Sequence, residues 1–79
     1  MPRDPQRTAR WVSSDLRRRI EADEWLAGQQ LPTLQEISEH YSVSVTTARK
    51  AVGALAEAGL VEVIHGYGVF RSQEETGSK

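Results

Sequence analysis

The chain has 79 residues, no cysteine and a formal net charge of -1 at pH 7, and 38% of its residues are hydrophobic. This length fits one compact domain that buries only about 60% of its unfolded surface, which excludes a large internal substrate cavity. The lack of cysteine excludes disulfides and cysteine-ligated metals, and no apolar run reaches the ~20 residues of a membrane span, so we expect a cytoplasmic protein without a membrane partner.

Charge is unevenly distributed along the chain. The first 20 residues contain six arginines and two aspartates, whereas residues 21–40 contain five acidic residues and no Lys or Arg. The net charge argues against strong, sequence-independent attraction to nucleic acid. Segregation of the two signs nevertheless permits one basic face on a nearly neutral protein.

The N-terminal part of the chain predicts an arm and a helix. Residues 1–7 contain two prolines and no apolar periodicity, which predicts a flexible arm. Apolar residues then recur every three or four positions from Trp11 to Ile20, which predicts an amphipathic helix from Thr8 to near Ala22. A run of three arginines in this helix can contact phosphate, but we expect at least two of them to be solvated.

A connector and a second helix follow. Residues 25–32 contain Gly and Pro and are too short for a helix, so we expect a connector with room for a brief strand near Leu31. Thr33 and Glu36 have the spacing of a capping box, in which each side chain accepts a hydrogen bond from the backbone N–H of the other residue. The second helix is therefore predicted to start at Thr33.

The third helix comes after a very short link. Ser44 is a good N-cap, apolar residues recur at helical spacing as far as Leu55, and Gly59 ends the helix. Only residues 41–43 separate the second and third helices. A link this short makes successive helices cross at about 90–120°, which is the helix-turn-helix geometry.

The C-terminal part changes from helical to strand periodicity. Residues 60–65 are rich in β-branched side chains and predict a strand, and residues 66–68 supply turn glycines. Residues 69–71 then predict a second strand, so the segment is expected to form a β-hairpin. The polar residues 72–79 predict a disordered tail. We therefore predict a single domain over 8–71 of mainly α class, a winged helix-turn-helix with a three-helix bundle and a two-stranded wing. A three-helix protein that uses the same pattern for packing alone is the alternative.

The residue types exposed on the third helix fit DNA. Its buried stripe leaves short hydroxyls and cations facing outward in the first two turns, namely Thr46, Thr47, Arg49 and Lys50. An α-helix fits the major groove, where Arg pairs bidentately with guanine, so Arg49 is the leading base-reading candidate. The alternatives are a solvated surface for the two cations and N-terminal capping for the two threonines.

The wing offers contacts to the DNA backbone. Gly66 and Gly68 let a backbone approach closely, and His65 or Tyr67 can hydrogen-bond to phosphate, although the glycines also serve a plain hairpin turn. His40 and His65 have no carboxylate partners at ligand spacing, and no Ser-His-Asp arrangement is present. We therefore expect no enzyme activity, no metal and no cofactor.

Taken together, these residues resemble the GntR family of bacterial transcriptional regulators over Ala9 to Phe70. The resemblance is carried by Leu16, Ile20, Gly28-x-x-Leu31-Pro32-Thr33, Val43 to Ala51, Leu55, Gly59-Leu60-Val61 and Gly66-x-Gly68-x-Phe70. It implies sequence-specific binding to double-stranded DNA, with repression favoured and, if a homodimer forms, a palindromic operator. The exposed residue types and the resemblance together predict a DNA-binding set of Thr33, Gln35, Ser44, Thr46, Thr47, Arg49, Lys50, His65, Gly66 and Tyr67.

The chain departs from the family pattern at four positions. Val45 and Gln35 stand where many members have Arg, Ile64 stands where a polar or basic wing residue is common, and Ser42 replaces a frequent turn Gly. These departures imply an altered affinity or sequence preference. The family's effector domain has no counterpart after the wing, so no small-molecule effector pocket is expected. The rival hypothesis is a protein-interaction winged helix with weak or no DNA binding.

Overall fold

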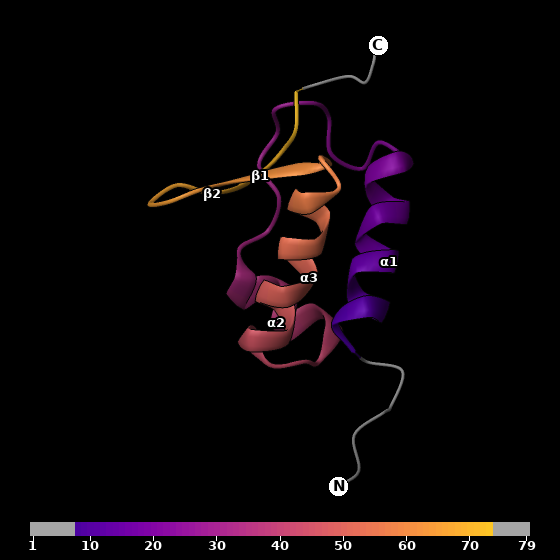
Figure 1. The fold of residues 1–79 in the computed structure, drawn as a ribbon, viewed down its shortest axis with the longest axis vertical. Helices are drawn as coiled ribbons and strands as arrows, with labels where there is room; N and C mark the ends of the chain where they lie inside the picture. The colour runs from indigo at the N-terminus through magenta and orange to yellow at the C-terminus, as the bar shows by residue number, and fades with distance from the viewer. Residues whose placement is uncertain (1–7, 74–79) are drawn as a thin grey trace, which may run out of the picture.

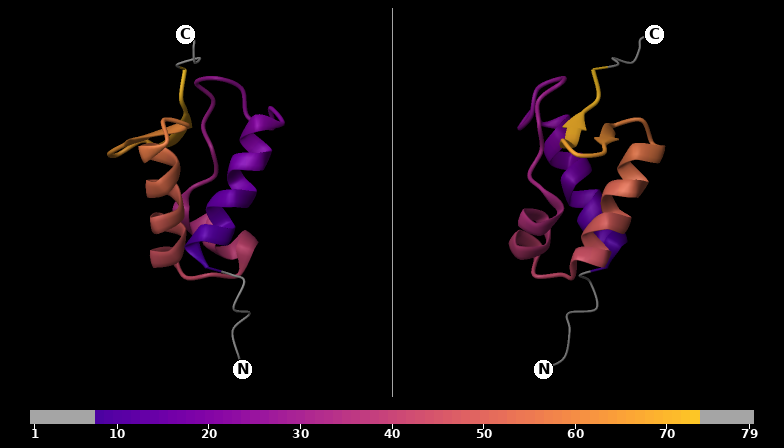
Figure 2. Two further views of the ribbon diagram at one scale, coloured as in Figure 1. Left: turned by 45° about the vertical axis from the view of Figure 1, so that its right-hand side comes forward. Right: turned by 90° about the vertical axis from the view of Figure 1, so that its left-hand side faces the viewer.

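The computed structural model describes residues 8–73, so the predicted arm and residues 74–79 of the predicted tail lie outside the described residues. The elements are α1 (Ala9–Glu21), α2 (Leu34–Tyr41), α3 (Val45–Glu57), β1 (Val61–Ile64) and β2 (Gly68–Arg71). Helices α1 and α3 run side by side, α2 lies near their N-terminal ends, and the hairpin projects from the C-terminal end of α3 (Figures 1 and 2). This is the predicted winged helix-turn-helix.

Each helix begins at a side chain that satisfies a backbone donor of the first turn. Thr8 and Ser44 each accept a hydrogen bond from the N–H three residues later, at 3.2 and 3.0 Å. The capping box is complete, since Thr33 Oγ1 accepts from Glu36 N at 3.1 Å and Glu36 Oε1 accepts from Thr33 N at 2.9 Å. Such caps stabilise helices by about 1 kcal/mol each, which explains why local sequence located the starts of these helices.

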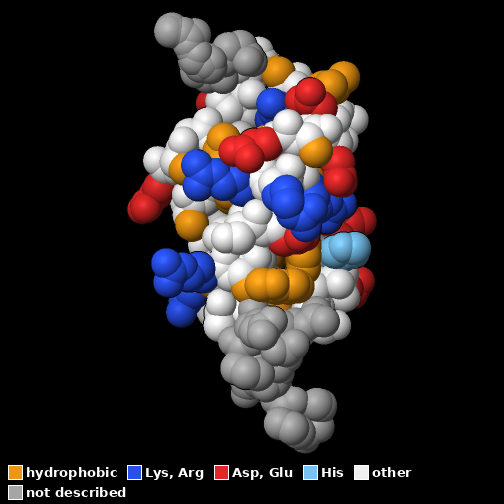
Figure 3. Space-filling model, turned by 90° about the vertical axis from the view of Figure 1, so that its right-hand side faces the viewer, with side chains coloured by type: hydrophobic (Ala, Val, Ile, Leu, Met, Phe, Trp, Pro, Cys, Tyr) orange, Lys and Arg blue, Asp and Glu red, His pale blue; other side chains and the backbone are white. Residues whose placement is uncertain are grey.

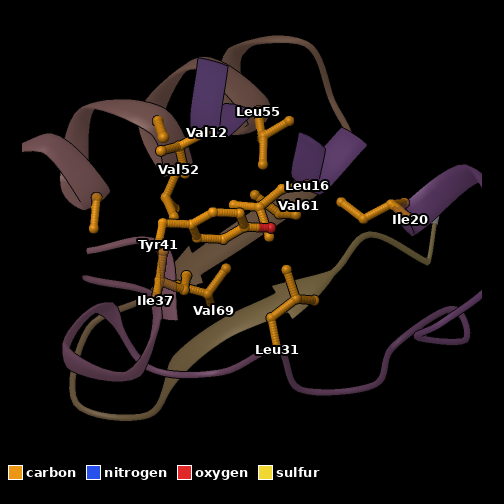
Figure 4. Close-up of a cluster of buried hydrophobic side chains, with 12 residues drawn as sticks. Val12, Leu16, Ile20, Leu31, Ile37, Tyr41, Val52, Leu55, Val61 and Val69 are labelled. Carbon is orange, nitrogen blue, oxygen red and sulfur yellow. The ribbon is translucent and has the colours of Figure 1, made fainter. Parts of the chain in front are cut away.

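The core combines one face of each helix with residues from the connector and both strands. The buried hydrophobic residues are Val12, Leu16, Ile20, Leu31, Ile37, Tyr41, Ala48, Ala51, Val52, Leu55, Val61 and Val69. The ring of Tyr41 reaches from α2 into the middle of this cluster (Figure 4). The stripe predicted for the third helix is therefore confirmed, and it turns the opposite face of α3 toward solvent.

The connector pairs with the outer edge of the hairpin through an isolated β-bridge between Gln30 and Phe70. Strands β1 and β2 pair antiparallel, with Val61 opposite Arg71. On the other edge of β2, Gly28 N donates to the Arg71 carbonyl at 2.9 Å, and Leu31 N donates to the Val69 carbonyl at 2.8 Å. Where a brief strand has room near Leu31, the structure therefore has an isolated β-bridge between Gln30 and Phe70 and no strand. Ser72 also belongs to the ordered hairpin, because its N–H donates to the Leu60 carbonyl at 3.0 Å.

A polar cluster joins α1 to α2 beside the core. The Tyr41 hydroxyl donates to Asp15 Oδ2 at 2.6 Å and accepts from Arg19 Nη1 at 3.0 Å. Arg19 also lies over the ring of Trp25, 4.8 Å from its centroid. The hydrogen bond from Tyr41 lowers the pKa of Asp15, and ion pairing with Arg18 adds to this effect. Sequence periodicity placed Tyr41 in the core but gave no sign of these partners.

Ser42 has a left-handed backbone, with φ of 58°, where the chain turns out of α2. This conformation costs roughly 1–2 kcal/mol for a residue with a Cβ and almost nothing for glycine. We therefore predict that Ser42→Gly raises the free energy of unfolding by about 0.5–1 kcal/mol, measured by urea denaturation. Ser14→Gly is the matched control, because Ser14 is exposed inside α1 and the change there should lower stability by about 0.5 kcal/mol. Loss of stability in both variants would contradict the prediction.

Tyr41→Phe should lower the free energy of unfolding at pH 7 by about 1–3 kcal/mol, because it removes a partly buried hydrogen bond to a charged carboxylate. The Asp15 pKa is lowered in the folded state, so this stabilisation is complete above the unfolded pKa of about 3.9 and disappears as pH falls through the folded value. The difference between wild type and variant should therefore shrink in acid.

Urea titrations at pH 7 and near pH 3 measure this difference, and Tyr67→Phe is the control. Its hydroxyl belongs to a residue that is 74% exposed and should contribute little to stability. An equally large loss for Tyr41→Phe at both pH values would rule out the proposed role of the Asp15 carboxylate.

Candidate nucleic-acid interface

The outward face of α3 carries the predicted hydroxyls and cations. Thr46, Arg49 and Lys50 are exposed, whereas Thr47 is half-buried. The Ser44 hydroxyl caps α3 and also donates to Thr47 Oγ1 at 3.0 Å. The N-cap of α3 is therefore Ser44, as predicted, and neither Thr46 nor Thr47 as in the capping alternative; Thr47 is the hydrogen-bond partner of the cap. Thr46 and Arg49 are left as the more accessible side chains.

Ion pairing separates the cations of α3 from most of the others. Four arginines pair with carboxylates: Arg17 with Glu21 at 3.4 Å, Arg18 with Asp15, Arg19 with Glu24 at 2.8 Å and Arg71 with Asp23 at 2.9 Å. Basic and acidic side chains accordingly alternate on the surface over α1 (Figure 3). Within residues 8–73, the Lys and Arg side chains that form no ion pair are Arg10, Arg49 and Lys50. The locally basic N-terminal sequence therefore does not make α1 a basic face.

A hollow of about 420 Å³ lies between α3 and the wing and reaches the start of α2. Its lining residues are Thr33, Leu34, Arg49, Val52, Gly53, Val63, Ile64, His65, Gly66, Gly68 and Val69. Four predicted site residues from three separate elements thus meet here: Thr33, Arg49, His65 and Gly66. The fold brings them together although they span more than thirty positions of the sequence.

The lining of this hollow is apolar and carries no acidic group. One guanidinium, from Arg49, and one imidazole, from His65, face it, and none of its lining residues is Asp or Glu. Val63 and Ile64 contribute its apolar wall and remain 52% and 42% exposed. The sequence analysis singles out Ile64 and does not single out Val63. Strand alternation would place Val63 on the same face as buried Val61, yet Val63 is half exposed in the wall of the hollow.

The remaining predicted site residues lie outside the hollow. Gln35 is exposed on α2, where its amide donates to Glu39 Oε2 at 3.0 Å. Tyr67 lies at the end of the wing and is 74% exposed. The predicted set therefore divides into residues of the hollow, residues of the start of α2 and the first two turns of α3, and the tip of the wing.

His40 packs edge-on against the Tyr41 ring, with 4.7 Å between ring centroids. Among residues 8–73 there is no group of three or more His, Asp or Glu side chains that could hold a metal ion. No helix in the same range is long and apolar enough to cross a membrane.

Comparisons with known proteins agree on the kind of domain. The chain is 36% identical over 66 residues to the Exu regulon transcriptional regulator of Escherichia coli, covering 84% of this chain and 26% of that protein. It is 35% identical over 57 residues to the HTH-type transcriptional regulator TreR of Bacillus subtilis, covering 72% of this chain and 24% of TreR. The chain thus spans about a quarter of the length of these relatives.

Solved structures share the fold. The N-terminal domain of AraR, crystallised with the mutant operator ORR3, superposes with a TM-score of 0.79 and 29% identity over 91% of this chain and all of that one. The AraR DNA-binding domain in complex with operator ORX1 superposes with a TM-score of 0.79 and 31% identity, covering 81% of this chain and 77% of that chain. The model of bacterial regulatory proteins of the gntR family matches residues 8–70. The chain therefore belongs to the gntR family, a family of regulators and not of enzymes.

Proposed function

We propose that this chain binds double-stranded DNA in a sequence-specific manner, with α3 in the major groove and the wing on the adjacent backbone. Its role is that of a DNA-binding domain of a bacterial transcriptional regulator, with repression favoured. The observation that carries the proposal is the combination of Arg49 and Lys50, which have no ion-pair partner in residues 8–73, with the carboxylate-free hollow beside them. The operator complexes of AraR, a protein of the same fold, support it.

The geometry of α3 suits this role. Helix α3 has 13 residues, or about 20 Å at 1.5 Å per residue, and an α-helix with its side chains is about as wide as the major groove. Arg49 projects from the second turn, where the long guanidinium can pair with guanine. Thr46 and Lys50 lie on the face of α3 opposite the buried stripe, and we assign phosphate contacts to them. The backbone N–H groups in the first turn of α3 that have no carbonyl partner within the helix also favour a phosphate at the N-terminal end of α3.

The wing supplies the second contact. Gly66 and His65 line the hollow, and Tyr67 is exposed at the tip, so backbone and side-chain donors project beyond the helices. Hydrogen bonds to phosphate and sugar hold a protein in register on the duplex without reading sequence. In this arrangement α3 determines specificity and the wing determines orientation.

The interface is short of positive charge for a DNA-binding surface. Arg49 and Lys50 are the two cations of α3, and Val45 occupies a position where Arg would add a third. Each neutralised phosphate contributes about -0.9 to the slope of log affinity against log salt, so we expect a slope of about -2 for one domain. Binding by one domain should therefore be weak. A homodimer that places two domains on half-sites about 34–36 Å apart would double the contacts, and we propose a palindromic operator on this ground.

A second candidate function is binding to another protein. It is favoured by the exposure of Val63 and Ile64, at 52% and 42%, in the wall of the hollow between α3 and the wing. Val45, half-buried at the start of α3, lies outside that lining and adds an apolar side chain where Arg would add charge. Apolar side chains gathered between a helix and a hairpin can receive an apolar segment of a partner. This candidate predicts little dependence on salt, since apolar burial does not release counterions.

The discriminating experiment selects bound fragments from random duplex DNA and then titrates the enriched duplex at 50 and 200 mM salt. We predict enrichment of a palindrome and a salt slope of about -2 per bound domain. A flat salt response without enrichment of any sequence would reject DNA binding and leave the protein-binding candidate.

Arg49→Ala should weaken binding to the enriched duplex by about 1–3 kcal/mol and relax its preference at one base pair. The matched control is Arg17→Ala, because Arg17 is also exposed on a helix but pairs with Glu21 on α1, away from the hollow. Fluorescence anisotropy with the enriched duplex and its single-base variants measures both effects. If Arg17→Ala weakens binding as much as Arg49→Ala does, the assignment of base reading to Arg49 is wrong.

A further inference from the structure

The outer edge of β2 is paired with the connector only along part of its length. The carbonyls of Arg71 and Val69 accept hydrogen bonds from Gly28 N and Leu31 N, at 2.9 and 2.8 Å. Residues of a strand alternate in the edge toward which their carbonyls point, so the next carbonyl on this edge is that of Tyr67. Tyr67 belongs to the turn of the wing, and its own N–H donates to the Ile64 carbonyl at 3.0 Å.

The backbone of the connector does not supply a donor to the Tyr67 carbonyl. By the same alternation, the donor two residues beyond Leu31 is Thr33 N, but this N–H is used in the capping box of α2, where it donates to Glu36 Oε1 at 2.9 Å. The chain must leave the sheet at this point to begin α2. The side chain of Gln30 fills the gap, because its Nε2 donates to the Tyr67 carbonyl at 2.9 Å.

Gly68 makes room for this contact. A Cβ at Gly68 would lie 2.7 Å from Gln30 Nε2, closer than atoms of this kind approach, and the φ of Gly68 is +122°. A residue with a side chain would therefore both strain the backbone and displace the Gln30 amide. The glycine next to the turn and the glutamine of the connector therefore fit each other closely, although they lie far apart in the sequence.

We propose that Gln30 is a positioning residue that holds the tip of the wing against the body of the domain for DNA binding. This inference rests on the proposed function. The turn is exposed, and within residues 8–73 the Gln30 amide is the one side chain with a hydrogen bond to its backbone. A tip already held in place loses less conformational freedom when it meets a sugar–phosphate backbone, so the affinity for DNA is higher.

The test in the free protein uses Gln30→Met, which keeps the length of the side chain and removes its donor. Heteronuclear NOE values of the Gly66, Tyr67 and Gly68 amides should fall in the full 79-residue chain, while those of α3 stay unchanged. Gln30→Lys keeps a donor at the end of a long chain and should restore the wild-type values. Gln35→Met is the matched control, because the Gln35 amide donates to Glu39 on α2 and should leave the wing unaffected.

The test on DNA compares the wild type and Gln30→Met on the duplex enriched by selection, with Arg17→Ala on α1 as the control. Gln30→Met should bind about three- to tenfold more weakly, the ratio that corresponds to one neutral hydrogen bond, with an unchanged salt slope since no charge is lost. Wing amides that stay rigid in Gln30→Met would overturn the inference, as would a loosened wing with unchanged affinity. Failure of the wild-type chain to bind any duplex would reject the proposed function instead, and the amide measurements would still decide whether Gln30 holds the wing.

Discussion

Ala48 and Ala51 are fully buried on one face of α3. The positions of the other elements depend on how they pack against this face. Helix α3 packs against α1, α2 and β1, and small side chains let the neighbouring backbones come close. A helix buried along one stripe has its opposite face determined, because successive residues turn by about 100°. Exposure of Arg49 and Lys50 is therefore a direct consequence of where the two alanines lie.

The distribution of ion pairs adds to this geometry. Three of the four arginines of α1, and Arg71 of β2, are matched by carboxylates at positions 15–24, while the two cations of α3 have no such partner within residues 8–73. A protein with a net charge of -1 can thus carry two unpaired cations side by side on one helix. The proposed attraction to DNA therefore rests on the helix that we propose reads the base sequence.

The wing depends on the connector as much as on its own two strands. An isolated two-stranded hairpin is marginally stable in water, and here the connector covers the outer edge of β2 as far as Val69. Beyond that point the start of α2 takes the next backbone donor, so a side chain must continue the pairing. The capping of α2 and the support of the wing are in this way linked through residues 30–33.

Sequence alone determined the elements. Helix starts at Thr33 and Ser44, the change of period after Gly59 and the buried stripe of α3 follow from local hydrogen bonds and from repeated apolar spacing, so they can be recognised without knowing the fold. Only the tertiary structure forms the hollow between α3 and the wing, the hydrogen bond of Tyr41 to Asp15, and the hydrogen bond from the Gln30 amide to the Tyr67 carbonyl. These contacts join residues 26 and 37 positions apart, and their formation depends on where the packed helices place the side chains, which no local pattern specifies.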